Sequence, residues 1–297
     1  MDSVLHAASD SAQASAPHGA EHGGGLFTEL LHHVQDAHFL DVPFAGHVDL
    51  PRFPPLEAAG MSVDLSITKH VVFLWVGALV LAGVAIAAAR SNIRRDVPRG
   101  LGNLLEIFVV FIRDEIAVAN MGPGGVRYMP YLLTTFFYIL VLNLLGLIPY
   151  GASATGNVSV TAGLALIAFV MIQAAAIRAQ GLRHWLAHLT GGVHWSLWVI
   201  MVPIEILGLF TKPFALCIRL FANMTGGHIV IVSLIGLIFI FQSYIAGVIS
   251  TGFVLGINFL ELFVAFLQAY IFTMLTALFM GLGMQAGAES GHGEGGH

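Results

Sequence analysis

The side chain that suggests chemistry most strongly in this sequence is Arg219, a basic residue inside a long apolar stretch. No other Lys or Arg occurs between it and the C-terminus. An arginine at membrane depth costs roughly 2.5–3.5 kcal/mol on insertion scales, so it lines a watery path, pairs with a carboxylate or snorkels to an interface. Most of the apolar stretch continues beyond Arg219, which makes snorkelling a poor explanation. We therefore expect Arg219 to have a functional role.

The stretch around Arg219 holds further polar groups, namely Glu205, Asn223 and His228. On a helix, Glu205 and Asn223 share the side of Arg219, whereas His228 lies opposite. Two prolines interrupt the stretch, so the placement of Glu205 depends on how they turn the helix. Histidine titrates near neutral pH, and protons can step between such groups and trapped water.

A second long apolar stretch carries Asn258, Glu261 and Gln268, which form one polar stripe on a helix. Two interpretations of Glu261 are open. It either neutralises Arg219 in a static ion pair or joins His228 in a path for protons. We favour the proton path, because acidic and histidine side chains inside a membrane commonly form such relays.

The composition excludes a soluble domain. Hydrophobic residues make up 57% of the 297 residues and charged residues 10%, with a mean hydropathy of +0.84. Soluble proteins carry about 25% charged residues, so the chain is an integral membrane protein. Its apolar runs have the length of helices and lack the alternation of a β-barrel. The single cysteine provides no disulfide or metal cluster, and there is no P-loop.

The long apolar runs predict an all-α fold with about five membrane helices. They lie at about 71–89, 131–149, 159–177, 195–242 and 251–285. Residues 100–120 mix apolar and charged side chains, and this pattern predicts an amphipathic interfacial helix. The last two runs are about twice the length of a perpendicular crossing, so we expect them to form a strongly tilted hairpin.

The charge distribution predicts the orientation in the membrane. Residues 1–60 are polar and rich in histidine, without the pattern of a cleaved signal peptide, and include one possible short helix at 26–38. Arginines cluster at 90–99, after the first predicted span. The positive-inside rule therefore places the N-terminus outside. The membrane domain is predicted at 61–286, and residues 287–297 are expected to form a flexible cytoplasmic tail.

Longer segments resemble a known family. They are PIEILGLFTKPFALCIRLFANMTGGH and FLELFVAFLQAYIFTML, supported by FIRDEIA, NLLGLIPY and GNVSVTAGLAL. Together they span roughly residues 98–284 and resemble the a subunit of the membrane sector of F-type ATP synthase. The resemblance implies a proton channel that is not catalytic by itself. We expect a bacterial inner membrane and not an organelle, because no Arg- and Ser-rich transit segment precedes the first span. The implied partners are a c-subunit ring, the b subunits of the peripheral stalk, the F1 sector indirectly, and lipid. It implies no cofactor and no nucleic acid.

The resemblance also implies roles for individual residues. Arg219 matches the essential arginine that faces the membrane carboxylate of each c subunit and separates two offset half-channels. Its fixed charge would keep the passing carboxylate ionised and block a direct proton leak. Asn223 and Gln268 match the polar neighbours that flank this arginine, and Asn258 belongs to the same polar stripe as Gln268.

The remaining matches concern the two half-channels. His228 and Glu261 match a pair that lines the outer half-channel, in the reverse order from some bacterial members. Glu205 matches the acidic residue of the cytoplasmic half-channel. Asn157 and Ser159 match polar positions on the outer side. We expect a complementary, exchanged pair at His228 and Glu261.

The main alternatives are an ion-coupled secondary transporter, another intramembrane proton-relay subunit and a histidine-rich metal transporter. The sequence has no internal repeat of the transporter kind. His184 and His188 have helical spacing but stand beside Arg183 at a predicted cytoplasmic edge, so no metal site is predicted. The proton is the expected coupling ion, because no cluster of oxygen ligands for sodium occurs in the predicted spans.

Overall fold

The long apolar runs fold as helices in the computed structural model, since backbone groups in lipid have to be hydrogen-bonded within their own segment. Five of these helices have the length and composition to cross a membrane, so the predicted all-α membrane fold is confirmed. The predicted helix at 26–38 lies outside the described residues. The structure describes residues 39–42, 46–49, 56–58, 61–63, 68–93, 100–148, 154–189, 197–241 and 243–291.

Two short antiparallel hairpins, which the sequence did not predict, precede the helices. Phe39 pairs with Asp49 in the first hairpin, and Leu56 pairs with Val63 in the second. Both lie within the polar N-terminal segment and its junction with the membrane domain. The four strands are β1 (Phe39–Val42), β2 (Gly46–Asp49), β3 (Leu56–Ala58) and β4 (Met61–Val63).

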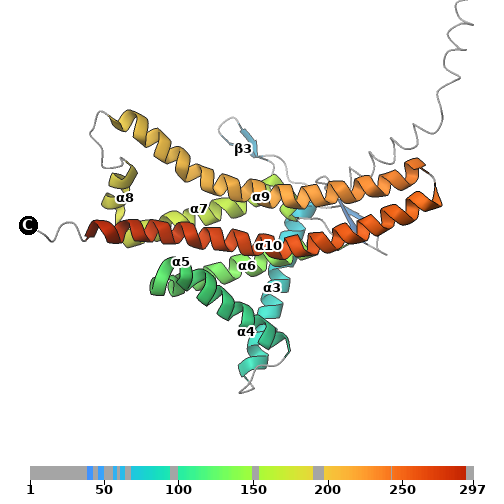
Figure 1. Cartoon of the computed structure of the whole chain (residues 1–297), viewed down its shortest axis with the longest axis horizontal. Coiled ribbons are helices and arrows are strands. Elements are labelled where there is room, and N and C mark those ends of the chain that lie inside the picture. The colour runs from blue at the N-terminus through green and yellow to red at the C-terminus, as the bar shows by residue number, and fades with distance from the viewer. Residues whose placement is uncertain are drawn as a thin grey trace, which may run out of the picture. The chain divides into compact units, whose positions relative to one another are not determined.

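The chain divides into two compact units, and each of the last two helices contributes to both. Of the residues that the structure describes, those within 226–260 form the first unit, and those within 37–225 and 261–297 form the second. The two helices are α9 (Trp198–Phe241) and α10 (Tyr244–Gly291), labelled in Figure 1. α10 continues into the predicted tail, because Met284, Gln285 and the alanines after them favour a helix.

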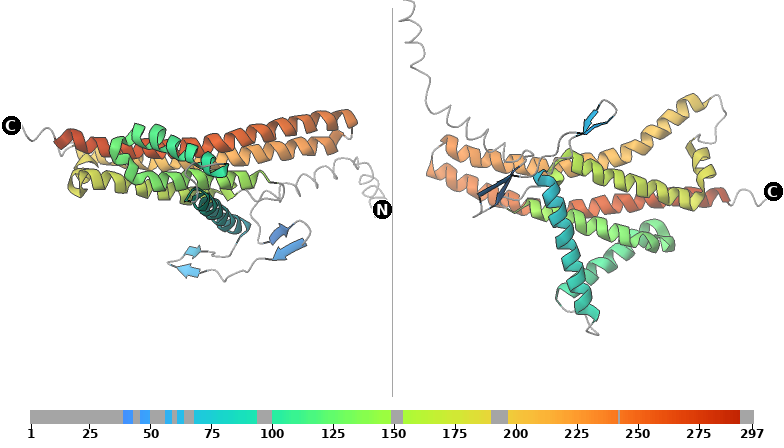
Figure 2. Two further views of the ribbon diagram at one scale, coloured as in Figure 1. Left: turned by 90° about the horizontal axis from the view of Figure 1, so that it is seen from below. Right: turned by 180° about the vertical axis from the view of Figure 1, so that it is seen from behind.

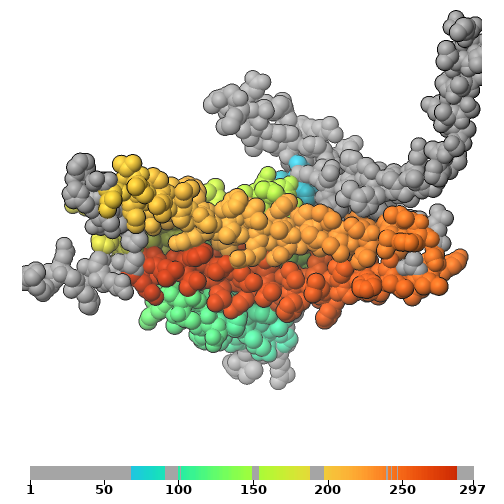
Figure 3. All heavy atoms as spheres, turned by 45° about the horizontal axis from the view of Figure 1, so that its top comes forward, coloured from blue at the N-terminus to red at the C-terminus, as the bar shows by residue number. Residues whose placement is uncertain are grey.

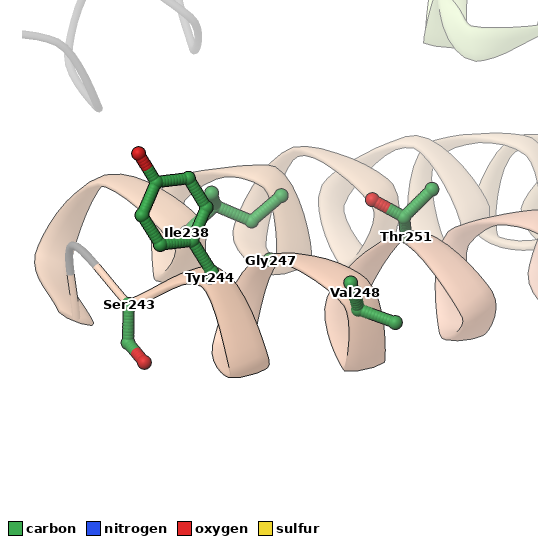
Figure 4. Close-up of a pocket in the computed structure, with 6 residues that line it drawn as sticks. All are labelled: Ile238, Ser243, Tyr244, Gly247, Val248 and Thr251. Atoms are coloured by element: carbon green, nitrogen blue, oxygen red, sulfur yellow. The ribbon is translucent and has the colours of Figure 1, made fainter.

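Within the first unit, the described residues form the hairpin of α9 and α10. The backbone N–H of Gly247 bonds to the carbonyl of Ser243 at 2.9 Å and begins the second helix. A Cβ on Gly247 would make only ordinary contact, 3.8 Å from Ile238 Cγ2. The turn borders a shallow, mainly apolar groove whose lining comes from the end of α9 and the start of α10 (Figure 4).

The first helix of the second unit is α3 (Lys69–Ile93), which crosses α6 (Met129–Gly146) (Figures 1 and 2). A Cβ on Gly77 would lie 2.7 Å from Leu142 Cδ2, so the two helices approach closely at this glycine. The hydroxyl of Tyr138 also donates to the carbonyl of Leu74 at 3.1 Å. Beyond this crossing, most of α3 is exposed. In the most apolar 18-residue window of the helix, 6% of the residues are buried.

The predicted interfacial segment is helical and runs on towards α6. It comprises α4 (Leu101–Phe111), the π-helical η1 (Ile112–Val118), α5 (Ala119–Met121) and the 3-10 helix η2 (Gly122–Tyr128). Its exposed side carries an ion pair between Arg113 and Asp114 at 2.7 Å, while Ile112 and Ile116 are buried. The helix type changes at the glycine-rich stretch 122–125, which Gly122 permits with a φ of 67°.

The next elements are the 3-10 turn η3 (Ala154–Gly156), α7 (Val158–Gln180) and the short α8 (Leu182–Leu189). Asn157 caps α7, because its Oδ1 accepts a hydrogen bond from the backbone N–H of Ser159 at 2.8 Å. Gly181 ends α7 with a φ of 82°. The third predicted span therefore folds as a single capped helix.

The core of the second unit forms where α6, α7, α9 and α10 meet. Its largest fully buried side chains include Leu132, Phe136, Leu216, Leu220 and Phe272. Further along its length, α10 packs closely against neighbouring segments at two glycines. A Cβ on Gly283 would lie 2.9 Å from Ala176 Cβ, and one on Gly281 would collide with the carbonyl of Asn120. The side chain of Gln180 donates to the carbonyl of Gly283.

Candidate functional site

A pair of side-chain amides joins α9 and α10 in the second unit. Asn223 Nδ2 donates a hydrogen bond to Gln268 Oε1 over 2.7 Å. Gln268 is buried, with 2% of its surface exposed, whereas Asn223 reaches the surface. Because Gln268 accepts through its oxygen, its own NH2 group remains able to donate elsewhere. The amide pair therefore fixes the orientation of Gln268.

Arg219 lies one helical turn before Asn223 and is half-buried. Its Nη1 atom and the Nε2 atom of Gln268 are both buried, and neither finds an acceptor in the part of the chain that the structure describes. Buried donors of this kind require an acceptor such as a carboxylate or water. The site thus presents one positive charge and adjacent amide donors, a combination suited to a carboxylate.

Glu261 is buried on α10, with 6% of its surface exposed, two turns before Gln268. The described residues contain no ion pair between Arg219 and Glu261, and Glu261 interacts with other groups. The structure therefore gives no support to the static ion pair considered above. Glu261 and Gln268 are both buried, and their spacing of seven residues places them near one another on α10.

Glu205 is half-buried near the start of α9, on the same helix as Arg219. At 1.5 Å per residue it lies about 21 Å from Arg219 along the helix axis. α9 is continuous through Pro203 and Pro213, so the prolines do not divide it. Between the two groups, Lys212 Nζ lies 5.1 Å from the centre of the Phe279 ring. Glu205 is thus separate from the amide pair.

His228 and Asn258 belong to the first unit and are half-buried there. Asn258 Nδ2 donates to the carbonyl of Val254 at 3.0 Å, one turn back in its own helix. Glu261, in contrast, belongs to the second unit. The pairing of His228 with Glu261 remains a prediction from the sequence.

Asn157 and Ser159 lie at the start of α7, where they form the cap described above. Ser159 is exposed, and Asn157 is half-buried. The turn before them is bonded to α9, because the hydroxyl of Thr225 donates to the carbonyl of Gly156 at 3.4 Å. These positions therefore have a clear structural function at the end of a helix.

Sequence reasoning missed a buried polar contact that involves Asn143 and Thr155. Asn143 on α6 is 2% exposed, and Thr155 in η3 is fully buried. The hydroxyl of Thr155 donates to Asn143 Oδ1 at 2.9 Å. An asparagine inside an apolar span was visible in the sequence, but nothing in the sequence indicated its partner.

The outer faces of α9 and α10 in the second unit are apolar. Leu207, Phe210 and Phe214 on α9 and Phe263 on α10 are more than half exposed, at 66%, 58%, 66% and 61%. In Figure 3 the yellow atoms of α9 and the red atoms of α10 lie side by side. Large exposed apolar surfaces on membrane helices face lipid or another protein. Leu207, Phe210 and Phe214 lie twelve, nine and five residues before Arg219, so helical spacing places them on the other side of α9 from Arg219.

No group of three or more His, Cys, Asp or Glu residues is placed to hold a metal ion among the residues that the structure describes. His184 lies exposed on the short helix α8. The histidine-rich metal transporter therefore gains no support. Five spanning helices and a site built from arginine, amides and a buried carboxylate instead define a multi-pass membrane protein with intramembrane polar chemistry.

Comparison with known proteins defines the family. A family model described as "ATP synthase A chain" matches residues 71–281. "ATP synthase subunit a" of Pelodictyon phaeoclathratiforme is 51% identical over 296 residues, covering 98% of this chain and 84% of the relative. The protein of that name from Chloroherpeton thalassium is 50% identical over 272 residues, covering 91% and 79%. A third, from Anaeromyxobacter dehalogenans, is 48% identical over 302 residues, covering 97% and 79%.

The chain belongs to the ATP synthase subunit a family. The resemblance predicted from the sequence is confirmed. The chain is a membrane subunit of the synthase and not an enzyme by itself, as expected. Together with the five spanning helices, its bacterial relatives identify a multi-pass protein of the inner membrane.

Proposed function

We propose that this chain is the proton-conducting stator subunit of an F-type ATP synthase, with Arg219 as its essential residue. The observation that carries the proposal is the site on α9 and α10. There a half-buried arginine lies one turn from the Asn223–Gln268 pair, and buried donor atoms of Arg219 and Gln268 have no acceptor among the described residues. A passing carboxylate on a neighbouring membrane protein would meet a positive charge and amide donors at this point.

The electrostatics explain why an arginine suits this role. Its guanidinium stays charged under all physiological conditions, so it stabilises an ionised carboxylate and cannot relay a proton itself. A proton on the approaching carboxylate would therefore have to leave before that carboxylate reached Arg219. Rotation of a ring of such carboxylates is then coupled to proton movement, because direct transfer past the arginine is blocked.

The two half-channels use the remaining polar residues. His228, Glu261, Asn157 and Ser159 serve the outer half-channel, and Glu205 serves the cytoplasmic one. The separation of about 21 Å between Glu205 and Arg219 on one helix suits access from a single side of the membrane. Asn258 extends the polar stripe of α10. These assignments rest on the family resemblance and on the burial of Glu261.

The partners follow from the same assignment. The c-subunit ring would contact the side of α9 that carries Arg219 and the exposed Asn223, with the last two helices tilted against it. The b subunits of the peripheral stalk would hold the chain in place, and the F1 sector would act through them. The N-terminus faces outside and the C-terminus faces the cytoplasm, as the arginine cluster at 90–99 predicts.

The test is proton pumping by the whole complex in inverted membrane vesicles, with Arg219 and with Arg219→Ala. We expect Arg219→Ala to abolish ATP-driven pumping and ATP synthesis while the complex stays assembled. Arg178→Ala is the matched control, because Arg178 is an exposed arginine in the last turn of α7. It should pump like the parent. Pumping retained by Arg219→Ala would refute the proposed function.

A further inference from the structure

The buried amide of Asn143 bridges three separate elements of the second unit. Its Nδ2 donates to the carbonyl of Ala265 on α10 at 3.3 Å, and its Oδ1 accepts from the hydroxyl of Thr155 at 2.9 Å. Burying an amide without partners costs several kcal/mol, so both bonds matter. The carbonyl it reaches lies on α10 between Glu261 and Gln268.

The same region is bonded to α9 on either side of the arginine. The hydroxyl of Thr225 donates to the carbonyl of Gly156 in η3 at 3.4 Å. Thr161 Oγ1 and Cys217 Sγ lie 3.5 Å apart, which joins the first turn of α7 to α9. Cys217 and Thr225 flank Arg219 in the sequence. η3 and the start of α7 therefore contact α9 at two points around Arg219. Asn143 on α6 is hydrogen-bonded to α10.

These contacts are directional, unlike the apolar packing around them. Lipid tails are as apolar as leucine, so helices in a bilayer gain little from one apolar register over another. A hydrogen bond from Asn143 to one particular carbonyl fixes which turn of α10 faces α6. The carbonyl has a second lone pair, so this bond is additional to the helical one.

We propose that Asn143 and Thr155 are positioning residues, which set the register of α10 so that Gln268 meets Asn223 beside Arg219. This inference rests on the proposed function and adds a role for two residues outside the proton path. Neither side chain exchanges protons in this scheme. They act only through the placement of the α10 turns that carry Glu261 and Gln268.

The experiment compares two substitutions of Thr155 in the whole ATP synthase complex in inverted vesicles. Thr155→Val removes the hydroxyl with little change in shape, and Thr155→Ser keeps it. Thr273→Val is the matched control, since the Thr273 hydroxyl is equally buried but donates only within α10, to the carbonyl of Ala269 at 2.8 Å. Asn143→Leu provides a second removal of the same bonds.

The readouts are ATP-driven pumping per assembled complex and the dependence of ATP synthesis on outer pH. We expect Thr155→Val and Asn143→Leu to pump about fivefold less than the parent, the factor that about 1 kcal/mol represents. The midpoint of their pH profile should move. Thr155→Ser should recover most of the activity, and Thr273→Val should keep the parental rate and profile.

Three results would overturn the positioning role. They are an unchanged Thr155→Val, an equal loss in Thr273→Val, and a Thr155→Val complex that fails to assemble, which would indicate a role in folding alone. The Arg219→Ala measurement keeps this test separate from the proposed function. If Arg219→Ala stops pumping and Thr155→Val does not reduce it, only the positioning role fails.

Discussion

Asn223 on α9 donates a hydrogen bond of 2.7 Å to Gln268 on α10, and this bond fixes which end of the Gln268 amide can act as a donor. The oxygen of Gln268 is occupied by Asn223, so its NH2 group is left to donate, and like Arg219 Nη1 it has no acceptor among the described residues. The Asn223–Gln268 pair therefore orients the Gln268 amide, and Arg219 supplies the positive charge of the site.

This relationship predicts coupling between the two amides. Asn223→Leu and Gln268→Leu should each lower ATP-driven pumping, and the double variant should lose less than the sum of the two. Side-chain hydrogen bonds between membrane helices contribute about 0.6 kcal/mol on average, so we expect a coupling of that order. Pumping by all three complexes in vesicles measures it. Asn103→Leu, at an exposed amide on α4, is the control and should not change pumping. A double variant whose loss equals the sum of the Asn223→Leu and Gln268→Leu losses would contradict the pairing.

The close approach of α10 to its neighbours predicts a steric effect at Gly281. A Cβ at this position would collide with the backbone carbonyl of Asn120, which cannot move aside as a side chain would. Overpacking of this kind costs about 1–3 kcal/mol, so Gly281→Ala should lower the amount of assembled subunit in membranes. Gly163→Ala is the control, because nothing lies within 4 Å of its added Cβ. Equal amounts of both variants would show that the packing is less tight than described.

The cation–π contact between Lys212 and Phe279 predicts a contribution to stability. Such contacts contribute about 0.5–2 kcal/mol. Lys212→Met and Phe279→Leu should each lower the temperature at which this subunit is lost from the solubilised complex. Lys212→Arg, which retains a cation over the ring, should keep most of the stability. If Lys212→Arg is as unstable as Lys212→Met, the contact does not hold the two helices together.

The family resemblance predicts that His228 and Glu261 act as a complementary pair. Each single exchange, His228→Glu or Glu261→His, should impair ATP synthesis, because it leaves two acidic or two basic groups. The double exchange should recover activity relative to either one. The measurement is ATP synthesis driven by an imposed proton gradient. A double variant no more active than the more active single variant would argue against the pairing.

The polar residues of the last two helices were predictable because charged and amide groups are rare and costly inside a membrane. The sequence alone therefore indicated Arg219, Glu261 and Gln268. Helical spacing predicted that Glu261 and Gln268 lie on the same side of α10. Both side chains are buried. The spans were likewise indicated by runs of about twenty apolar residues.

Other features left no signal in the sequence. The partner of Asn143 is the backbone carbonyl of Ala265, which every residue possesses, so no pattern of side chains could indicate it. The same holds for Gly281, whose importance comes from the carbonyl of Asn120 beside it. The hairpins at 39–63 were missed because their strands, of three or four residues, are too short to give a recognisable alternating pattern.

The sparse contacts of α3 have a consequence for how the protein is assembled. Its apolar window is 6% buried, and its close contacts with α6 occur around Gly77 and Leu74. Most of its surface is therefore available to lipid, and the rest of the chain covers little of it. Such a helix inserts into the bilayer independently and associates with its neighbours afterwards. The first membrane helix can therefore anchor the chain in the bilayer before the helices that carry the proton path have packed together.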